Sequence, residues 1–172
     1  MKKLLIVVDF QNDFVNGSLG FAGAEMLDLK ICELIKAFDR EGNDVVYTLD
    51  THSADYLNTE EGKCLPVPHC IPGTIGYEVF GNTKELLKSK VCFKKNTFPS
   101  LDLGEWIKGK GYEEITVVGL DLSICVLSNA VIAKAACPNA HIIVDTSCSS
   151  GGDKVANEIA IAALKRIQVE IR

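Results

Sequence analysis

One cysteine and a few charged residues lie where predicted strands end, and their types suit nucleophilic chemistry. Residues 119–124 follow an apolar run and bring Cys125 to the start of a predicted helix, where unpaired backbone N–H groups and the helix dipole favour a thiolate. Asp9 directly follows another apolar run, so we expect partial burial to raise its pKa toward the range of a general base. A thiol that attacks a carbonyl also needs a charge-stabilising partner, and Lys94 or Lys95 could supply it. Because a strand sends adjacent side chains to opposite faces, at most one of these lysines is catalytic.

A second group of residues has the composition of a metal site. Asp50 and His52 are two positions apart, so they project to the same side if the strand continues through them. His69 could complete a set of two imidazoles and one carboxylate, which leaves coordination positions open for water or substrate. Such a set suits Zn²⁺, Mn²⁺ or Fe²⁺ without distinguishing them. The alternative is that these are ordinary loop histidines, and the remaining histidine, His141, has no partner in view.

The other cysteines do not form a recognisable framework. The chain has seven cysteines, an odd number, and no CxxC spacing, which argues against a closed disulfide set and against a zinc ribbon. Cys32 falls within a predicted helix, Cys92 within a strand and Cys137 at a helix end, so each has a poorer position for a nucleophile than Cys125. We expect most of them to be buried thiols in a reducing cell.

The composition excludes two classes of partner. With 23 acidic and 18 basic side chains, the net charge of -5 argues against a surface for DNA or RNA. The longest apolar run near the start, residues 4–8, is far shorter than the roughly 20 residues that span a bilayer and shorter than the core of a signal peptide. We therefore expect a cytoplasmic protein that binds neither nucleic acid nor membrane.

Strands and helices that alternate along the chain must position these residues. Several apolar runs are nearly continuous, as in parallel strands covered on both faces, and apolar residues at helical spacing lie between them. At 172 residues the chain has the length of one domain. The pattern predicts a single α/β domain over residues 1–172, with a doubly wound, mostly parallel six-stranded sheet and helices on both faces. The predicted strands are 4–8, 45–49, 91–93, 115–118, 141–144 and 167–171, and the predicted helices are 27–38, 126–133 and 153–163, the last one capped by Asp153.

Residues 50–81 interrupt this alternation. The segment is rich in Pro and Gly and contains no convincing helix. A long irregular segment inside a compact domain is usually functional or disordered, and the His and Asp content favours function here. Ligands of open α/β sheets bind at the carboxyl edge of the strands, which is where we expect both groups of candidate residues to meet.

Five motifs together resemble the cysteine hydrolases of the isochorismatase-like superfamily, which includes the nicotinamidases. Residues 8–14 are similar to the D-x-Q-x-D-F motif, and residues 95–98 resemble K-x-x-aromatic. Residues 119–126 resemble the G-x-x-x-x-x-C-V nucleophile turn. The order and spacing of all five motifs match over nearly the whole chain, and the other two motifs are Asp50-Thr51-His52 and His69-Cys70 followed by Gly73-Thr74.

The resemblance implies specific roles for these residues. It implies a Cys125–Asp9–Lys95 triad, and so selects Lys95 over Lys94. It also implies a cis peptide between Leu120 and Asp121, which would aim the backbone N–H groups of Asp121 and Cys125 at the substrate oxygen as an oxyanion hole.

In the nicotinamidase branch, the pattern matched by Asp50, His52 and His69 binds a divalent metal that holds the pyridine nitrogen of the substrate. Phe14 resembles an aromatic residue of the substrate pocket. The tryptophan that nicotinamidases usually carry three residues before the last metal histidine is Pro66 here, and the only tryptophan is Trp106. The family also implies a homo-oligomer.

The resulting hypothesis is an amidohydrolase that cleaves a small, nicotinamide-like carboxamide through a thioester and releases ammonia. Two alternatives stay open at this point. One is an isochorismatase-type vinyl-ether hydrolase or a carbamoyl-amide hydrolase of the same fold. The other is a binding or redox-sensing module that keeps a reactive thiol without catalysis.

Overall fold

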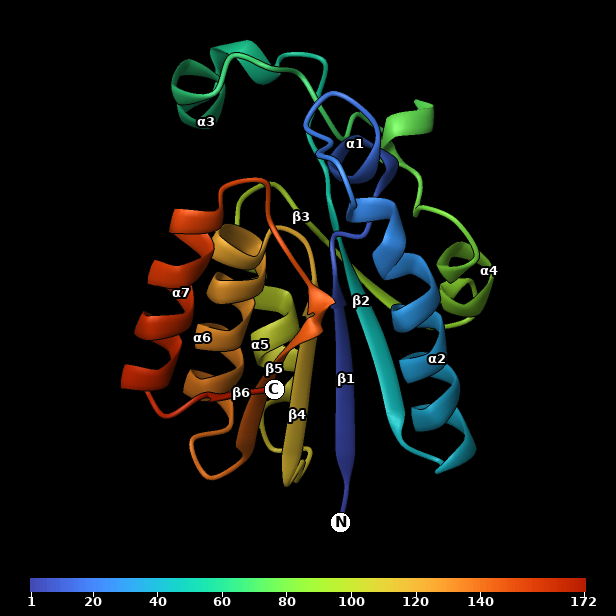
Figure 1. The fold of residues 1–172 in the computed structure, drawn as a ribbon, viewed down its shortest axis with the longest axis vertical. Coiled ribbons are helices and arrows are strands. Elements are labelled where there is room, and N and C mark those ends of the chain that lie inside the picture. Colours follow the sequence, from blue (N-terminus) through green and yellow to red (C-terminus); the bar gives the residue numbers. More distant parts are fainter.

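A computed structural model describes all 172 residues, whose strands and helices form an α/β structure. Helices cover both faces of a central sheet (Figure 1). The strands are β1 (Lys3–Val8), β2 (Asp44–Asp50), β3 (Val91–Lys95), β4 (Glu114–Gly119), β5 (His141–Ser149) and β6 (Glu170–Ile171). The helices are α1 (Asn12–Val15), α2 (Leu27–Arg40), α3 (Glu60–Cys64), α4 (Thr83–Leu87), α5 (Leu101–Ile107), α6 (Leu127–Ala136) and α7 (Lys154–Arg166). No helix combines the length and the apolar character that crossing a membrane requires.

The six strands are all parallel, in the order β3-β2-β1-β4-β5-β6. The chain leaves β1 toward one side of the sheet and later returns to add β4 on the other side of β1. The order therefore reverses between β1 and β4, and a crevice forms at such a point beyond the carboxyl ends of the strands. Asp9 follows β1 and Cys125 follows β4, so the topology brings both residues to this crevice.

Alternate residues of β1 point into two separate hydrophobic cores. Leu4, Ile6 and Val8 pack on the face covered by α5, α6 and α7. Leu5 and Val7 pack on the opposite face, which α2 covers. Because both faces of the strand are buried, its sequence is continuously apolar, as the sequence pattern predicted.

The predicted architecture is confirmed, with two corrections to its elements. The last strand covers only Glu170–Ile171, because α7 continues to Arg166 and a turn with Gln168 at φ 65° separates helix from strand. The segment 50–81 does contain helix: α3 and the 3₁₀ turns Tyr56–Asn58 and Ile75–Tyr77. These pieces have three to five residues each, too few for a periodic apolar pattern to reveal them.

Candidate active site

Cys125, Lys95 and Asp9 meet at the carboxyl edge of the sheet. Lys95 Nζ lies 2.5 Å from Oδ2 of Asp9 and 3.6 Å from Sγ of Cys125. The hydroxyl of Thr48 donates to the other oxygen of Asp9 at 2.6 Å, which fixes the carboxylate. Asp9 has a φ of 44°, a left-handed conformation that turns the chain sharply as it leaves β1. Asp9 is fully buried, and Lys95 and Cys125 are each 6% exposed.

Burial governs the protonation of this group. It raises the pKa of Asp9, and the lowering effect of the Lys95 cation is smaller. Burial alone would lower the pKa of Lys95, but the charges of Asp9, Cys125 and Asp50 outweigh it and raise that pKa. Burial and then the Asp9 charge raise the pKa of the Cys125 thiol well above its usual value. The expectation of a thiolate stabilised by the helix start is therefore wrong for the free protein, and the thiol needs a base.

Four side chains beside this group form a cluster with the composition of a metal site. The ligand atoms of Asp50, His52, Glu61 and His69 all lie within 4.8 Å of one another. Oδ2 of Asp50 is 2.9 Å from Nε2 of His52 and 3.3 Å from Nε2 of His69. Oε1 of Glu61 is 3.5 Å and 3.7 Å from the same two nitrogens. The other oxygen of Asp50 is 3.2 Å from Nζ of Lys95, so the cluster and the cysteine site share a boundary.

The chemistry of these donors fits a divalent cation. Nδ1 of His69 lies 2.8 Å from the carbonyl oxygen of Val67, which as an acceptor requires the proton on Nδ1 and leaves Nε2 free to bind a metal. Burial would raise the pKa of Asp50, but the nearby ring nitrogens of His52 and His69 and the charge of Lys95 outweigh it, so the pKa is lowered and the carboxyl stays ionised. Two imidazoles and two carboxylates suit Zn²⁺, Mn²⁺ or Fe²⁺.

The segment that contains α1 holds the backbone around two of these donors. The buried amide of Gln11 accepts from the N–H of Asp50 at 2.8 Å and donates to the carbonyl oxygens of Asp50 and Tyr77 at 3.0 Å and 2.9 Å. Oδ2 of Asp13 accepts from the N–H of Cys70 at 2.7 Å, directly after His69. The D-x-Q-x-D-F motif therefore supplies Asp9 and also the two side chains that fix the metal-site backbone.

A small cavity of about 270 Å³ opens above the thiol of Cys125. Besides Cys125, the hydrophobic residues that line it are Phe14, Leu19, Phe21, Leu65, Phe98 and Ile124. Asp50 and Glu61 of the cluster form part of its wall, so a flat ring seated here would face both the thiol and the metal donors. The volume suits a single small ring rather than a larger ligand.

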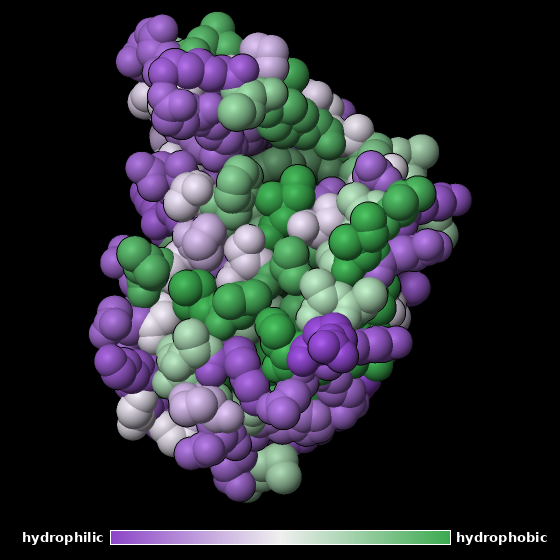
Figure 2. Space-filling view, turned by 90° about the vertical axis from the view of Figure 1, so that its left-hand side faces the viewer, coloured by the Kyte–Doolittle hydropathy of each residue, from purple (hydrophilic) through white to green (hydrophobic).

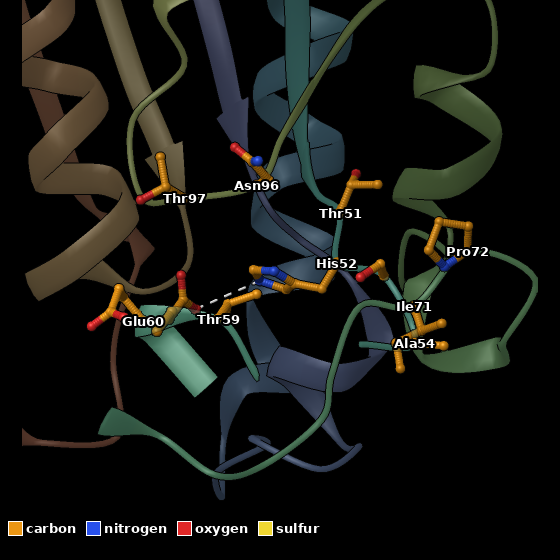
Figure 3. Close-up of a pocket in the computed structure, with 11 residues that line it drawn as sticks. Thr51, His52, Ala54, Thr59, Glu60, Ile71, Pro72, Asn96 and Thr97 are labelled. Carbon is orange, nitrogen blue, oxygen red and sulfur yellow. Dashed lines mark ion pairs between the residues drawn. The ribbon is translucent and has the colours of Figure 1, made fainter. Parts of the chain in front are cut away.

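A second cavity of about 850 Å³ lies on the other side of the cluster, and most of the residues that line it are polar (Figure 3). His52 points into it, and the dashed line in Figure 3 marks the ion pair of His52 with Glu61. Because His52 and Glu61 line this cavity while Asp50 and Glu61 line the smaller one, the cluster is the wall between them.

Comparison with known proteins identifies the family to which this site belongs. Residues 3–171 match the Isochorismatase domain family. This protein is a member of the isochorismatase family. An uncharacterised isochorismatase family protein, PncA, of Bacillus subtilis is 33% identical over 77% of this chain and 79% of its own.

Other similar members of the isochorismatase family carry the name of an activity. The nicotinamidase/pyrazinamidase of Mycobacterium tuberculosis is 26% identical over 96% of this chain and 94% of its own. The crystal structure of the nicotinamidase/pyrazinamidase PncA from Bacillus subtilis superposes with a TM-score of 0.87 at 29% identity, covering 99% of both chains. The likeness extends over the whole isochorismatase domain, including the segment with the metal-type donors.

The structure brings together the site residues that the isochorismatase resemblance implied. Lys95 points to Asp9 whereas Lys94 is exposed, and the peptide between Leu120 and Asp121 is cis. Phe14 packs against His69 with ring centroids 5.5 Å apart, and it lines the cavity. Of the predicted residues, Phe14, Asp50, Asp121 and Cys125 line the smaller cavity and His52 lines the larger one. Lys95 contacts Cys125 and Asp9, His69 lies beside Asp50, and Leu120 is buried in the core.

Three other observations refine the sequence analysis. Glu61 was missed as a fourth donor, although two glutamates after a capping Thr59 were a signal for an acidic helix start. Pro66 is exposed and does not line the cavity, and its neighbour Leu65 does. Trp106 packs between Phe93 and Tyr112 in the core, away from the site.

Proposed function

We propose that this protein is a cysteine-dependent amidohydrolase that converts a small, nicotinamide-like carboxamide into its acid and ammonia. The observation that carries the proposal is the meeting of Cys125, Lys95 and Asp9 beneath a ring-sized apolar cavity whose wall holds metal-type donors. The names of the Mycobacterium and Bacillus relatives support the same class of substrate.

The buried triad accounts for each proton in this reaction. The raised pKa of Asp9 makes it a stronger base, and it takes the proton of the Cys125 thiol as sulfur attacks the amide carbon. The backbone N–H groups of Asp121 and Cys125, with Lys95 nearby, stabilise the oxyanion, and one such donor is worth about 3 kcal/mol. Asp9 then protonates the departing ammonia. A water molecule, deprotonated by Asp9, attacks the thioester and releases the acid and the thiol.

Asp50, His52, Glu61 and His69 would hold the metal in this scheme. When bound, a divalent cation would supply a Lewis-acid site for a ring nitrogen of the substrate. Phe14 and Phe98 would contact the faces or edges of the same ring, since both line the cavity. These contacts position the carboxamide over Cys125, so ring binding and bond cleavage are carried out by different groups.

Ammonia release from a panel of aromatic and aliphatic amides tests the proposal. We expect the metal-loaded protein to hydrolyse nicotinamide and the Cys125→Ala variant to do so at least 1,000-fold more slowly. The control variant Cys64→Ala, which removes an exposed cysteine, should keep the wild-type rate. Including a vinyl ether and a carbamoyl amide tests the alternative chemistries. Full activity of Cys125→Ala would contradict the mechanism, and rapid labelling of Cys125 without turnover of any substrate would favour a binding module.

We also propose that copies of this chain associate in the cytoplasm. The face that carries α6 and α7 has apolar residues gathered at its centre (Figure 2). Val131 of α6 and Val155 and Ile159 of α7 are exposed. A second copy would bury this apolar surface. All seven cysteines are free, which suits a reducing compartment. Light scattering of the wild type and of Ile159→Lys tests the association, since a charge at the contact would lower the measured mass.

A further inference from the structure

The mouth of the small cavity carries two carboxylates that the proposed reaction does not use. Asp121 and Asp153 line this cavity, and its lining contains no Lys, Arg or His. The other two acidic residues of the lining, Asp50 and Glu61, belong to the metal-type cluster. Lys95 lies beneath Cys125, but its ammonium is already 2.5 Å from Asp9 and 3.2 Å from Asp50. The lining of the cavity itself therefore offers no cation to a ligand carboxylate, and the charge of Lys95 beneath it is already paired with Asp9 and Asp50.

Both carboxylates occupy helix starts that would otherwise attract an anion. Asp121 caps the helical turn Leu122–Val126, which leads into α6, and accepts from the N–H and the hydroxyl of Ser123, each at 2.8 Å. Asp153 caps α7 and accepts from the N–H of Ala156 at 3.0 Å. An unoccupied helix N-terminus favours anions through its free N–H groups and dipole. At this cavity, the carboxylates of Asp121 and Asp153 accept hydrogen bonds from N–H groups of these helix starts, where a ligand anion would otherwise bind.

The backbone at Gly151 leaves the space that the Asp121 carboxylate occupies. A Cβ atom at the buried Gly151 would lie 2.4 Å from both carboxylate oxygens of Asp121, so only glycine leaves room for it. The carboxylate is thus held by Ser123 on one side and by the backbone of the loop before α7 on the other.

We propose that Asp121 and Asp153 make this cavity selective for neutral ligands, so that an uncharged amide binds and its anionic carboxylate product is expelled. The inference rests on the proposed function, which makes the amide the substrate and the carboxylate its product. The acid forms in a partly desolvated site, where the repulsion between like charges is stronger than in bulk water. The same repulsion disfavours substrates that already carry a carboxylate.

Calorimetric titration of nicotinamide and nicotinate into the metal-loaded Cys125→Ala protein tests this selectivity, because that background does not consume the amide. Asp121→Asn and Asp153→Asn are added to it singly, since asparagine keeps the cap and removes the charge. Asp145→Asn is the matched control: Asp145 accepts from the N–H and hydroxyl of Ser147 as Asp121 does from Ser123, but it lies outside the cavity.

We expect each cavity variant to bind nicotinate about 3- to 10-fold more tightly at low salt, with a smaller gain at high salt. Asp153→Asn, which lies outside the proposed catalytic group, should change nicotinamide affinity less than about twofold. The Asp145→Asn control should match its parent. Unchanged nicotinate affinity in both cavity variants, or an equal gain in the control, would overturn the proposal. If the wild type failed to hydrolyse nicotinamide, the proposed function alone would be wrong, because these titrations measure binding. If neither compound bound to any variant, both would be wrong.

Discussion

In the proposed mechanism, the buried contact between Asp9 and Lys95 allows a cysteine with a raised pKa to act as a nucleophile. Lys95 Nζ is within reach of both the carboxylate and the sulfur, so a proton that moves from Cys125 to Asp9 leaves a thiolate beside an ammonium. The new negative charge on sulfur lies beside the positive charge of Lys95, which balances it as it balanced the charge of Asp9 before. We therefore expect the thiolate to form only when the substrate is attacked, with the thiol as the resting form.

Replacing Asp9 by asparagine should therefore remove the proposed general base and keep the shape of the side chain. We expect the rate of amide hydrolysis to fall by about 100- to 10,000-fold, because the thiol then has no buried acceptor for its proton. The rate of alkylation of Cys125 by iodoacetamide should fall as well, and measuring both links the loss to the nucleophile. Asp39→Asn, at an exposed position, serves as the charge control. Hydrolysis at near wild-type rate in Asp9→Asn would show that another group accepts the proton.

Single residues of the site could be predicted where the chemistry depends on residue type and on strand ends. Asp9, Asp50 and Cys125 follow apolar strands, and their position at one edge follows from the parallel topology. The choice between Lys94 and Lys95 depends on which of them projects from β3 to the face of the sheet where Asp9 lies. The strand pattern left that choice open, the family resemblance selected Lys95, and the structure places it against Asp9.

At the scale of elements, α1 and the loop before it connect the cysteine site to the metal-type cluster. Gln11 forms three hydrogen bonds to the ends of β2 and of the 50–81 segment, all with buried or half-buried partners. A side chain without these groups would leave the backbone of Asp50 unpaired.

We expect Gln11→Met to weaken metal binding by about 10- to 100-fold, the usual effect of losing an outer-shell partner. Asn12→Ala is the control, because the exposed amide of Asn12 bonds to Ile75 and does not touch any of the four donors. Competition with a chromogenic chelator measures both affinities. Equal affinity in Gln11→Met and wild type would contradict a positioning role for Gln11.

A second element, α4, depends on a carboxylate from α2. Asp28 is buried and accepts from the N–H and hydroxyl of Thr83 and from the N–H and amide of Asn82. Burial alone would raise the pKa of Asp28, but these hydrogen bonds outweigh it and lower the pKa below its usual value. A carboxyl whose pKa is lower in the folded state stabilises the fold at neutral pH and loses this effect as pH falls below its unfolded value of about 3.9.

We expect Asp28→Ala to lower the free energy of unfolding by about 2 kcal/mol at pH 7. The difference from wild type should shrink as pH falls below about 4, because protonation removes the same stabilisation from the wild type. Urea unfolding at several pH values measures the difference, and Glu33→Ala, at an exposed position of the same helix, should stay within about 0.5 kcal/mol of wild type. A difference that did not depend on pH would contradict the assignment.

The elements between residues 50 and 81 show the limit of prediction from one sequence. The turn of α3 that carries Glu61 has five residues, and its stability comes from the Thr59 cap and from packing rather than from an apolar stripe. Only the folded segment brings Glu61 next to His52 and His69, which lie on other parts of the chain. Long elements such as α2 and β1 were predictable because their residues repeat the period of the structure they form.

At the scale of the whole molecule, a bound metal would join separate parts of the chain. Its donors come from the end of β2, from α3 and from the loop before Cys70. Binding that occurs only in the folded state stabilises the fold, by about 2.7 kcal/mol when the free metal is 100 times its dissociation constant. We expect such an excess of Zn²⁺ to raise the Tm by about 5–10 °C, a chelator to reverse the change, and Asp50→Ala to lose it. An equal rise in Asp50→Ala would place the bound metal elsewhere.

Six parallel strands place the ends of β1, β3 and β4 at one edge of the sheet, and the cysteine site consists of the residues that follow or end these strands. Rapid-quench mass spectrometry of the metal-loaded protein during turnover of nicotinamide tests the central claim, that Cys125 attacks the amide carbon, most directly. The account predicts an acyl adduct on the peptide that contains Cys125, formed as ammonia is released and removed by water. Continued ammonia release with no adduct on that peptide, or with an adduct on another cysteine, would contradict it.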